Sequence, residues 1–121
     1  QGDLAERVAA VKEKVEEVET LLRDQGLPPH VMVDCSHGNS MKDFRNQPLV
    51  ANALCKQIAE GSKTVVAAMV ESNLVEGNQK LVPDLTELTR GQPVTDACIG
   101  GEDTVSLQDR FAEAVRARRG V

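Results

Sequence analysis

The chain has 121 residues, which is enough for at most one small domain. Its formal net charge of −5 leaves no surplus of basic residues, which excludes general binding to nucleic acid. No apolar run approaches the length of about 18 residues that a transmembrane helix needs, so we expect no membrane partner either.

The aromatic residues and the cysteines indicate what kind of core and environment to expect. Aromatic residues make up only 2% of the chain, so the core must consist of valine, leucine, alanine and isoleucine. The chain has three cysteines, an odd number, and none of them has CxxC spacing: Cys35, Cys55 and Cys98. We therefore expect reduced thiols and not a disulfide framework. The first residues show no signal-peptide pattern. We therefore expect a cytoplasmic location.

Residues 4–25 are predicted to form a long amphipathic helix. Its apolar side chains recur at alternating intervals of four and three residues, at Leu4, Val8, Val11, Val15, Val18 and Leu22. This spacing fits either a helix that packs one face on a sheet or a coiled-coil seam that joins two copies of the chain. Gly26 suits the position after the last turn, and Pro28 prevents the helix from continuing.

Two apolar runs and two further helices follow. We predict strands at residues 31–35 and 64–70, helices at residues 48–60 and 104–118, and helix-capping roles for Glu102, Asp103 and Thr104. A helix between two strands of this spacing indicates parallel strands with a right-handed crossover, and so an α/β fold. Residues 72–95 form a long polar connection, of a kind that is usually functional or disordered.

Side chains that can bind a metal ion follow both predicted strands. His37 comes after the first strand, Glu71 directly after the second, and Asp96 lies in the loop beyond. Functional residues of parallel α/β proteins lie at the C-terminal ends of strands, which are about 4.8 Å apart, so these side chains can meet at one ion. A histidine with carboxylates suits Mn²⁺, Fe²⁺, Co²⁺ or Zn²⁺. The alternative is that His37 is a hydrogen-bonded loop residue without a ligand.

Four strings of residues carry a resemblance to a known family. In chain order they are DCSHGNSMKDFRNQP, AMVESNLVEGNQ, TDACIGGEDT and AEAVRARRG. Together they resemble the C-terminal part of the type I DAHP synthases, also called phospho-2-dehydro-3-deoxyheptonate aldolases, over residues 27–120. The fold of that family is a (β/α)₈ TIM barrel. The resemblance therefore implies that residues 27–121 are the last βαβα section of such a barrel, preceded by the amphipathic helix in residues 1–26.

The resemblance also implies an activity. Members of this family are aldol-type transferases that condense phosphoenolpyruvate with erythrose 4-phosphate, the first step of the shikimate pathway to the aromatic amino acids, and they require a divalent metal ion. The metal-binding residues of the family match His37 in D-x-S-H-x-N-S, Glu71 in M-[VI]-E-S and Asp96 in T-D-A-C-I-G. The resemblance further implies a phosphate contact for Ser36 and a catalytic contact between Asp96 and the hydroxyl groups of the sugar phosphate.

The chain departs from the family pattern at three points. The fourth metal ligand of the family, a cysteine, and its Lys and Arg substrate clamp belong to earlier strands that have no counterpart here. Cys35 stands where the family has an aromatic residue, and Gly101 stands where it has a tryptophan. If the first strand persisted to His37, Cys35 and Val33 would share a side with it, and Cys35 would offer a thiolate ligand. The alternative is a small buried thiol.

Two strands alone leave sheet edges and apolar faces open, whereas a complete barrel needs about 250 residues. Three hypotheses follow. The chain is a section of a DAHP synthase whose activity belongs to the complete barrel. Alternatively, it is a noncatalytic metal-, phosphate- or partner-binding subunit that assembles through its N-terminal helix. The third hypothesis is a short enzyme whose site forms between subunits. We expect a complementing barrel segment, or further copies of the chain in a homo-oligomer, as partner.

Overall fold

The computed structural model describes residues 2–120. Its main elements, in chain order, are α1 (Gly2–Asp24), β1 (Val31–Asp34), α2 (Gln47–Ala59), β2 (Val65–Met69) and α3 (Gly101–Arg119). Three short 3₁₀ helices, η1 (His37–Ser40), η2 (Phe44–Asn46) and η3 (Leu85–Glu87), lie in the connections. This order confirms the predicted α/β class with two strands separated by a helix.

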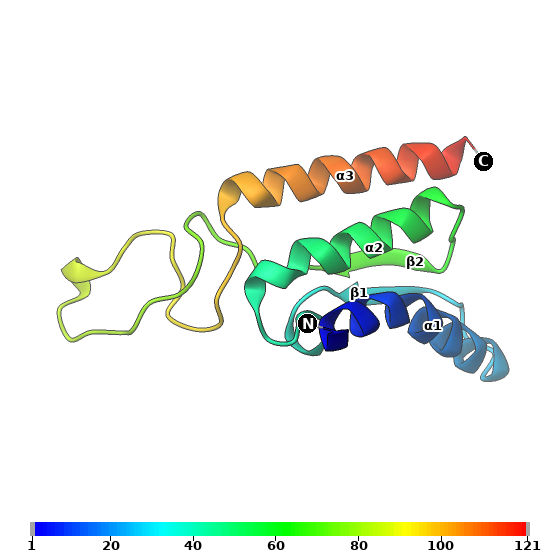
Figure 1. Cartoon of the computed structure of the whole chain (residues 1–121), viewed down its shortest axis with the longest axis horizontal. Coiled ribbons are helices and arrows are strands. Elements are labelled where there is room, and N and C mark those ends of the chain that lie inside the picture. The colour runs from blue at the N-terminus through cyan, green and yellow to red at the C-terminus, as the bar shows by residue number, and fades with distance from the viewer. Residues whose placement is uncertain (1, 121) are drawn as a thin grey trace.

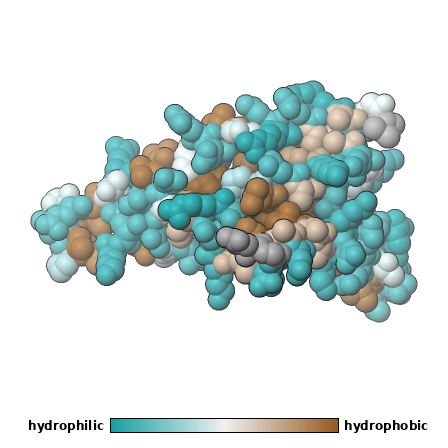
Figure 2. Space-filling view, viewed as in Figure 1, coloured by the Kyte–Doolittle hydropathy of each residue, from teal (hydrophilic) through white to brown (hydrophobic). Residues whose placement is uncertain are grey.

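α2 lies between α1 and α3, and α1 and α2 pack against β1 and β2 (Figure 1). The connection between β2 and α3 leaves this body and projects to one side before it returns to the start of α3. Several apolar side chains are exposed on this projecting segment, where Figure 2 shows brown patches among hydrophilic atoms. These exposed residues include Leu74, Leu81 and Leu85.

The two strands pair in parallel, as predicted. The register runs from Val31 opposite Val65 to Asp34 opposite Met69, with an irregularity after the first pair. The helices cover only one face of this small sheet, and the apolar side chains of Met32 and Val66 are 63% and 56% exposed. The expectation that two strands alone leave apolar surface open is thus confirmed.

The core is aliphatic and is shared by all three helices. Its buried side chains include Val11, Val15, Val33, Val50, Leu54, Val65, Leu107 and Ala114. The middle of the heptad-like seam of α1 therefore packs against the protein's own core, which favours the amphipathic helix over the coiled coil. α1 ends as its sequence predicts: Gly26 has a φ of 70°, and the N–H of Leu27 donates to the carbonyl of Leu22 (2.9 Å).

The predicted start and capping of α3 were wrong. The helix begins at Gly101 and not at Thr104, its N-cap is Gly100, and no side chain caps it. A backbone hydrogen bond fixes the first residue of the helix: the N–H of Gly101 donates to the carbonyl of Leu74, where the projecting segment returns. The hydroxyl of Thr104 donates backwards to the carbonyl of Gly100. Among residues 2–120, no helix is both long and apolar enough to cross a membrane.

Replacing Leu54 by alanine should destabilise the fold by about 3 kcal/mol, because this side chain is 0% exposed and its removal leaves a cavity. The matched control is Leu49→Ala on the same helix. Leu49 is 47% exposed, and we expect a loss below about 1 kcal/mol. Urea denaturation of both variants measures the difference. Equal losses would contradict the assignment of the inner face of α2.

Candidate metal centre

His37 lies in a tight turn directly beyond β1. The strand ends at Asp34, and His37 begins η1 with a φ of 50°, in the left-handed region that few non-glycine residues adopt. The condition for alternation through residue 37 is therefore not met, because the extended strand ends at Asp34, three residues earlier. Cys35 is buried in the core, whereas His37 is exposed.

Asp34 holds the imidazole ring of His37 from one side. Its carboxylate accepts hydrogen bonds from the backbone N–H of Ser36 (2.7 Å) and from the Ser36 hydroxyl, and it lies 2.8 Å from Nδ1 of His37. The sequence analysis did not single out Asp34, because in a strand that reached His37 the two residues would lie on opposite sides. The D-x-S-H spacing was the available signal, since a turn brings residues three apart together.

These contacts fix which ring nitrogen carries the proton. The neighbours of Nδ1 are the acceptor Asp34 and the hydroxyl of Ser36, whose own proton points to Asp34. We therefore assign the hydrogen to Nδ1, which leaves a lone pair on Nε2 when the ring is neutral. A carboxylate behind the histidine in this way is the usual support for a metal-binding imidazole.

The same pair shifts both pKa values. The hydrogen bond with Asp34 raises the pKa of His37, and the charges of Asp34, Glu71 and Asp96 act in the same direction against a smaller effect of desolvation. Partial burial raises the pKa of Asp34, but the hydrogen bonds from Ser36 and His37 together outweigh it, so the pKa of Asp34 is lowered.

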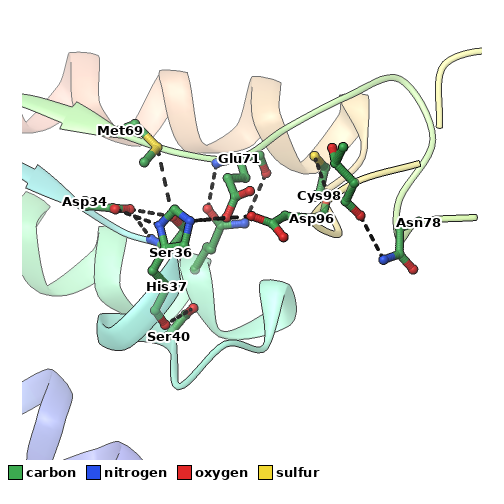
Figure 3. A network of polar contacts seen from close by, with 11 residues as sticks. Asp34, Ser36, His37, Ser40, Met69, Glu71, Asn78, Asp96 and Cys98 are labelled. Carbon is green, nitrogen blue, oxygen red and sulfur yellow. Dashed lines mark hydrogen bonds and ion pairs between the residues drawn. The ribbon is translucent and has the colours of Figure 1, made fainter. Parts of the chain in front are cut away.

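The structure brings His37, Glu71 and Asp96 together (Figure 3). Nε2 of His37 lies 3.8 Å from a carboxylate oxygen of Glu71 and 3.6 Å from one of Asp96. The three candidate ligand atoms all lie within 4.8 Å of one another. They come from the end of β1, the end of β2 and the returning part of the projecting segment.

Backbone pairing returns the loop of Asp96 to the strands. Ile99 forms a bridge with Ser72, and its N–H donates to the carbonyl of Glu71 (3.0 Å). The side chain of Asn78 donates to the carbonyl of Thr95 (3.0 Å), directly before Asp96. Residues far apart in sequence thus place two carboxylates beside each other.

Gln47 supports the same site from α2. Its side chain is 0% exposed, its Nε2 donates to the carbonyl of Glu71 (3.0 Å), and its Oε1 accepts from the N–H of Glu71 (2.8 Å). Sequence reasoning missed this residue, because a polar side chain at the start of a helix is usually exposed. Only its place between the loop and the helix, shortly after the histidine motif, could have drawn attention to it.

The candidate ligands open into a cavity of about 390 Å³. Its lining is mixed, with polar, charged and apolar side chains from both strand ends and the returning loop. The residues that line it are His37, Ser40, Lys42, Phe44, Glu71, Asn78, Asp96 and Ala97. Lys42 is the lysine among them, so the lining combines two carboxylates with one positively charged side chain.

The donor set fits a divalent cation. The lone pair of Nε2 faces two carboxylates, an arrangement in which three electron-pair donors repel one another unless a positive charge lies between them. Bonds of about 2.1 Å to an ion place ligand atoms about 3.0 to 4.2 Å apart, close to the observed separations from His37. One imidazole and two carboxylates suit the borderline first-row ions.

Two other predicted participants are placed differently. Cys35 lies outside this group, and burial raises the pKa of its thiol to about 12, which favours the small buried thiol over the thiolate ligand. Ser36 is 2% exposed, and its hydroxyl is occupied by Asp34 and His37. Its phosphate contact stays a prediction, as do the individual roles of His37, Glu71 and Asp96.

Comparison with known proteins identifies the family. The chain matches the DAHP synthetase I family over residues 5–109, a range that contains every residue of the candidate centre. The chain belongs to this family. The resemblance is therefore confirmed at the level of the type I DAHP synthase family, and the match includes most of α1.

Relatives and a solved structure agree with this assignment. The chain is 51% identical over 106 residues to the Phe-sensitive phospho-2-dehydro-3-deoxyheptonate aldolase of Escherichia coli K12, covering 88% of this chain and 30% of that protein. It is 43% identical over 118 residues to the tyrosine-inhibited enzyme of Schizosaccharomyces pombe, covering 95% and 30%. The aldolase structure from Francisella tularensis SCHU S4 superposes with a TM-score of 0.82 at 43% identity, covering 88% and 30%. The chain thus spans about 30% of the length of these DAHP synthase relatives.

Replacing Asp34 by asparagine should lower the pKa of His37 in the metal-free protein, because the carboxylate that raises it is lost. In the wild type this pair stabilises the fold at mildly acidic pH, where His37 is protonated and Asp34 is ionised. The contribution disappears as the pH rises through the raised pKa of His37, and also as it falls through the lowered pKa of Asp34. NMR titration of the His37 ring nitrogens measures the shift.

Asp43→Asn is the matched control, because Asp43 caps η2 in the same loop by accepting from the N–H of Arg45. His37 should titrate in this variant as in the wild type. Identical titration of His37 in the Asp34 variant would contradict the assigned contact.

Proposed function

We propose that this chain forms the metal-binding, C-terminal section of a DAHP synthase barrel, in which phosphoenolpyruvate condenses with erythrose 4-phosphate. The observation that carries the proposal is the convergence of His37, Glu71 and Asp96 at the C-terminal ends of two parallel strands. Active sites of (β/α)₈ enzymes lie at this end of the barrel. Family membership supplies the reaction.

The open surfaces of the sheet support a place within a larger barrel. A cavity of about 430 Å³ lies beside β2, between the strand and α3, and apolar side chains such as Val66, Ala68, Leu107 and Phe111 line it. In this proposal β1 and β2 are the last two strands, residues 27–121 are the final βαβα section, and residues 1–26 precede it. The partner is a complementing barrel segment, or further copies of the chain, that covers this edge.

The metal ion in this proposal is Mn²⁺, Fe²⁺, Co²⁺ or Zn²⁺, held by His37, Glu71 and Asp96. When bound, the ion supplies Lewis-acid polarisation of the aldehyde of erythrose 4-phosphate. Asp34 keeps the hydrogen on Nδ1, so that Nε2 presents its lone pair to the cavity. Asp96, more exposed than Glu71, is the carboxylate proposed to contact the hydroxyl groups of the sugar phosphate as well.

The substrates carry phosphate, and two residues of the chain are candidates to bind it. Ser36, the residue expected from the resemblance, must exchange its contact with Asp34 for the phosphate. Lys42 lines the cavity directly, and its backbone N–H donates to the carbonyl of His37 (2.8 Å), which holds the lysine beside the histidine. A lysine ammonium is a common phosphate partner.

The second candidate function is a noncatalytic metal- or phosphate-binding subunit that assembles through α1. Two observations favour it: the chain spans about 30% of its relatives, and Val18 and Leu21 near the end of α1 are exposed. The middle of the seam is occupied by the chain's own core, so this assembly would use only the last turns of the helix. A site formed between subunits would combine this assembly with the proposed reaction.

The 121-residue chain should bind one Mn²⁺ ion, and His37→Ala should weaken binding by about a hundredfold or more, because one of three ligands is lost. His30→Ala is the matched control, since His30 lies outside the candidate group and should leave binding unchanged. Isothermal titration calorimetry measures both affinities. Equal affinity in the two variants would contradict the proposed centre.

The reaction is tested in a chimera in which this chain replaces the matching segment of the Escherichia coli Phe-sensitive relative. We expect Mn²⁺-dependent consumption of phosphoenolpyruvate that requires erythrose 4-phosphate. The same chimera with His37→Ala should lose about a hundredfold or more of that rate, since metal polarisation contributes several kcal/mol. A folded, metal-binding chimera without turnover would contradict the enzymatic proposal and favour the noncatalytic subunit.

A further inference from the structure

The side chain of Gln47 makes a two-point contact with the backbone of one residue, Glu71. Gln47 is the first residue of α2, and its amide both donates to the carbonyl and accepts from the N–H of Glu71. A primary amide offers a donor and an acceptor side by side, as a peptide group of a neighbouring strand does. The side chain of Gln47 is completely buried, so its amide has no access to water and both hydrogen bonds are costly to lose.

The Gln47 side chain bonds the backbone of Glu71 just beyond the last pair of the two strands. The ladder between β1 and β2 ends at Asp34 and Met69, and the last bond runs from the N–H of Cys35 to the carbonyl of Met69 (2.8 Å). Glu71 lies two residues further on, where β1 has already turned away into η1. Without Gln47, the N–H of Glu71 would lose the acceptor that holds it in line with the strand, and its carbonyl would keep only the hydrogen bond from Ile99.

The same carbonyl also reaches the loop that carries Asp96. The carbonyl oxygen of Glu71 accepts from Gln47 and from the N–H of Ile99 (3.0 Å), and the carbonyl of Ile99 accepts from the N–H of Asn73 (3.0 Å). The peptide groups around Glu71 therefore join α2, the end of β2 and the returning loop. The positions of both carboxylates depend on this junction.

We propose that Gln47 is a positioning residue that sets the placement of Glu71, and through Ile99 that of Asp96, relative to Nε2 of His37. The inference rests on the proposed metal centre and names the residue on which its geometry depends. Affinity for the ion then depends on both the donor (Nε2) and the acceptor (Oε1) of the buried Gln47 amide. Glutamate in its place offers no donor to the carbonyl of Glu71, and methionine offers neither donor nor acceptor.

The test compares Mn²⁺ binding by the 121-residue chain and its Gln47→Glu and Gln47→Met variants, by calorimetry and by the electron paramagnetic resonance spectrum of the bound ion. We expect affinity to fall about tenfold or more in both variants, as for other residues that hold metal ligands, with a changed spectrum for the remaining bound ion. Circular dichroism checks that the variants are folded.

Gln57→Met is the matched control. Gln57 is another buried glutamine of α2, but it lines a different cavity near the N-terminal ends of the strands, with Glu19 and Thr64. The Gln57→Met variant should bind Mn²⁺ with the affinity of the wild type. A general loss of helix stability would affect both positions, whereas a positioning role affects Gln47 alone.

Hydrogen exchange in the wild type provides a measurement that needs no variant to fold. The amide hydrogen of Glu71 should be protected, because Gln47 accepts it, and Mn²⁺ should increase that protection. Folded Gln47 variants that bind Mn²⁺ with wild-type affinity, or an unprotected Glu71 amide, would overturn the inference while leaving the metal centre intact. A wild-type chain that binds no Mn²⁺ would overturn the metal centre and this inference with it.

Discussion

Repulsion between electron-pair donors is the constraint around which this end of the molecule is built. With the hydrogen of His37 on Nδ1, the lone pair of Nε2 faces the carboxylates of Glu71 and Asp96 at 3.8 and 3.6 Å. Such an arrangement costs free energy while the ring is neutral and no cation is present, which is why the two carboxylates help to raise the pKa of His37. It becomes favourable when a proton on Nε2 or a metal ion lies between the donors. An ion that binds only the folded state therefore stabilises the folded chain against unfolding.

The loops at the C-terminal ends of the strands consist largely of contacts that hold these donors in place. Three non-glycine residues adopt left-handed backbone conformations between β1 and α2, namely His37, Met41 and Lys42. Strained conformations of this kind persist where surrounding contacts impose them, and they are frequent at functional sites. Here the side chains of Asn39 and Asn46 supply such contacts by donating to the carbonyls of Asp34 and Ser40.

The sequence predicted the regular elements well, because hydrophobic periodicity reports which side chains face a core. The alternation of intervals in α1 gave its buried face, and the apolar runs gave both strands within one residue of their observed ends. His37 and Glu71 were found for the same reason, since each follows a run that ends at the same edge of a parallel sheet. Asp96 was considered as a further ligand because it lies in the loop after the second strand, and the family motif then matched it to a metal-binding residue; periodicity did not place it.

The contacts that support the site could not be predicted in this way. Alternation holds only while the chain stays extended, so it failed at Asp34 and His37, where the strand had already ended. Gln47 was missed because its burial results from a partner distant in sequence, the backbone of Glu71. The start of α3 was displaced for a similar reason, because the carbonyl of Leu74 fixes Gly101. Tertiary contacts, which no local pattern records, decided the last two, whereas the first is a local turn that the D-x-S-H spacing could have indicated.

The most direct measurement is a crystal structure of the Mn²⁺-loaded chain with anomalous scattering from manganese. The account predicts one anomalous peak about 2.0 to 2.3 Å from Nε2 of His37 and from carboxylate oxygens of Glu71 and Asp96, with Asp34 still bonded to Nδ1. A peak at another site, or an ion held by the carboxylates with the ring of His37 turned away, would contradict it.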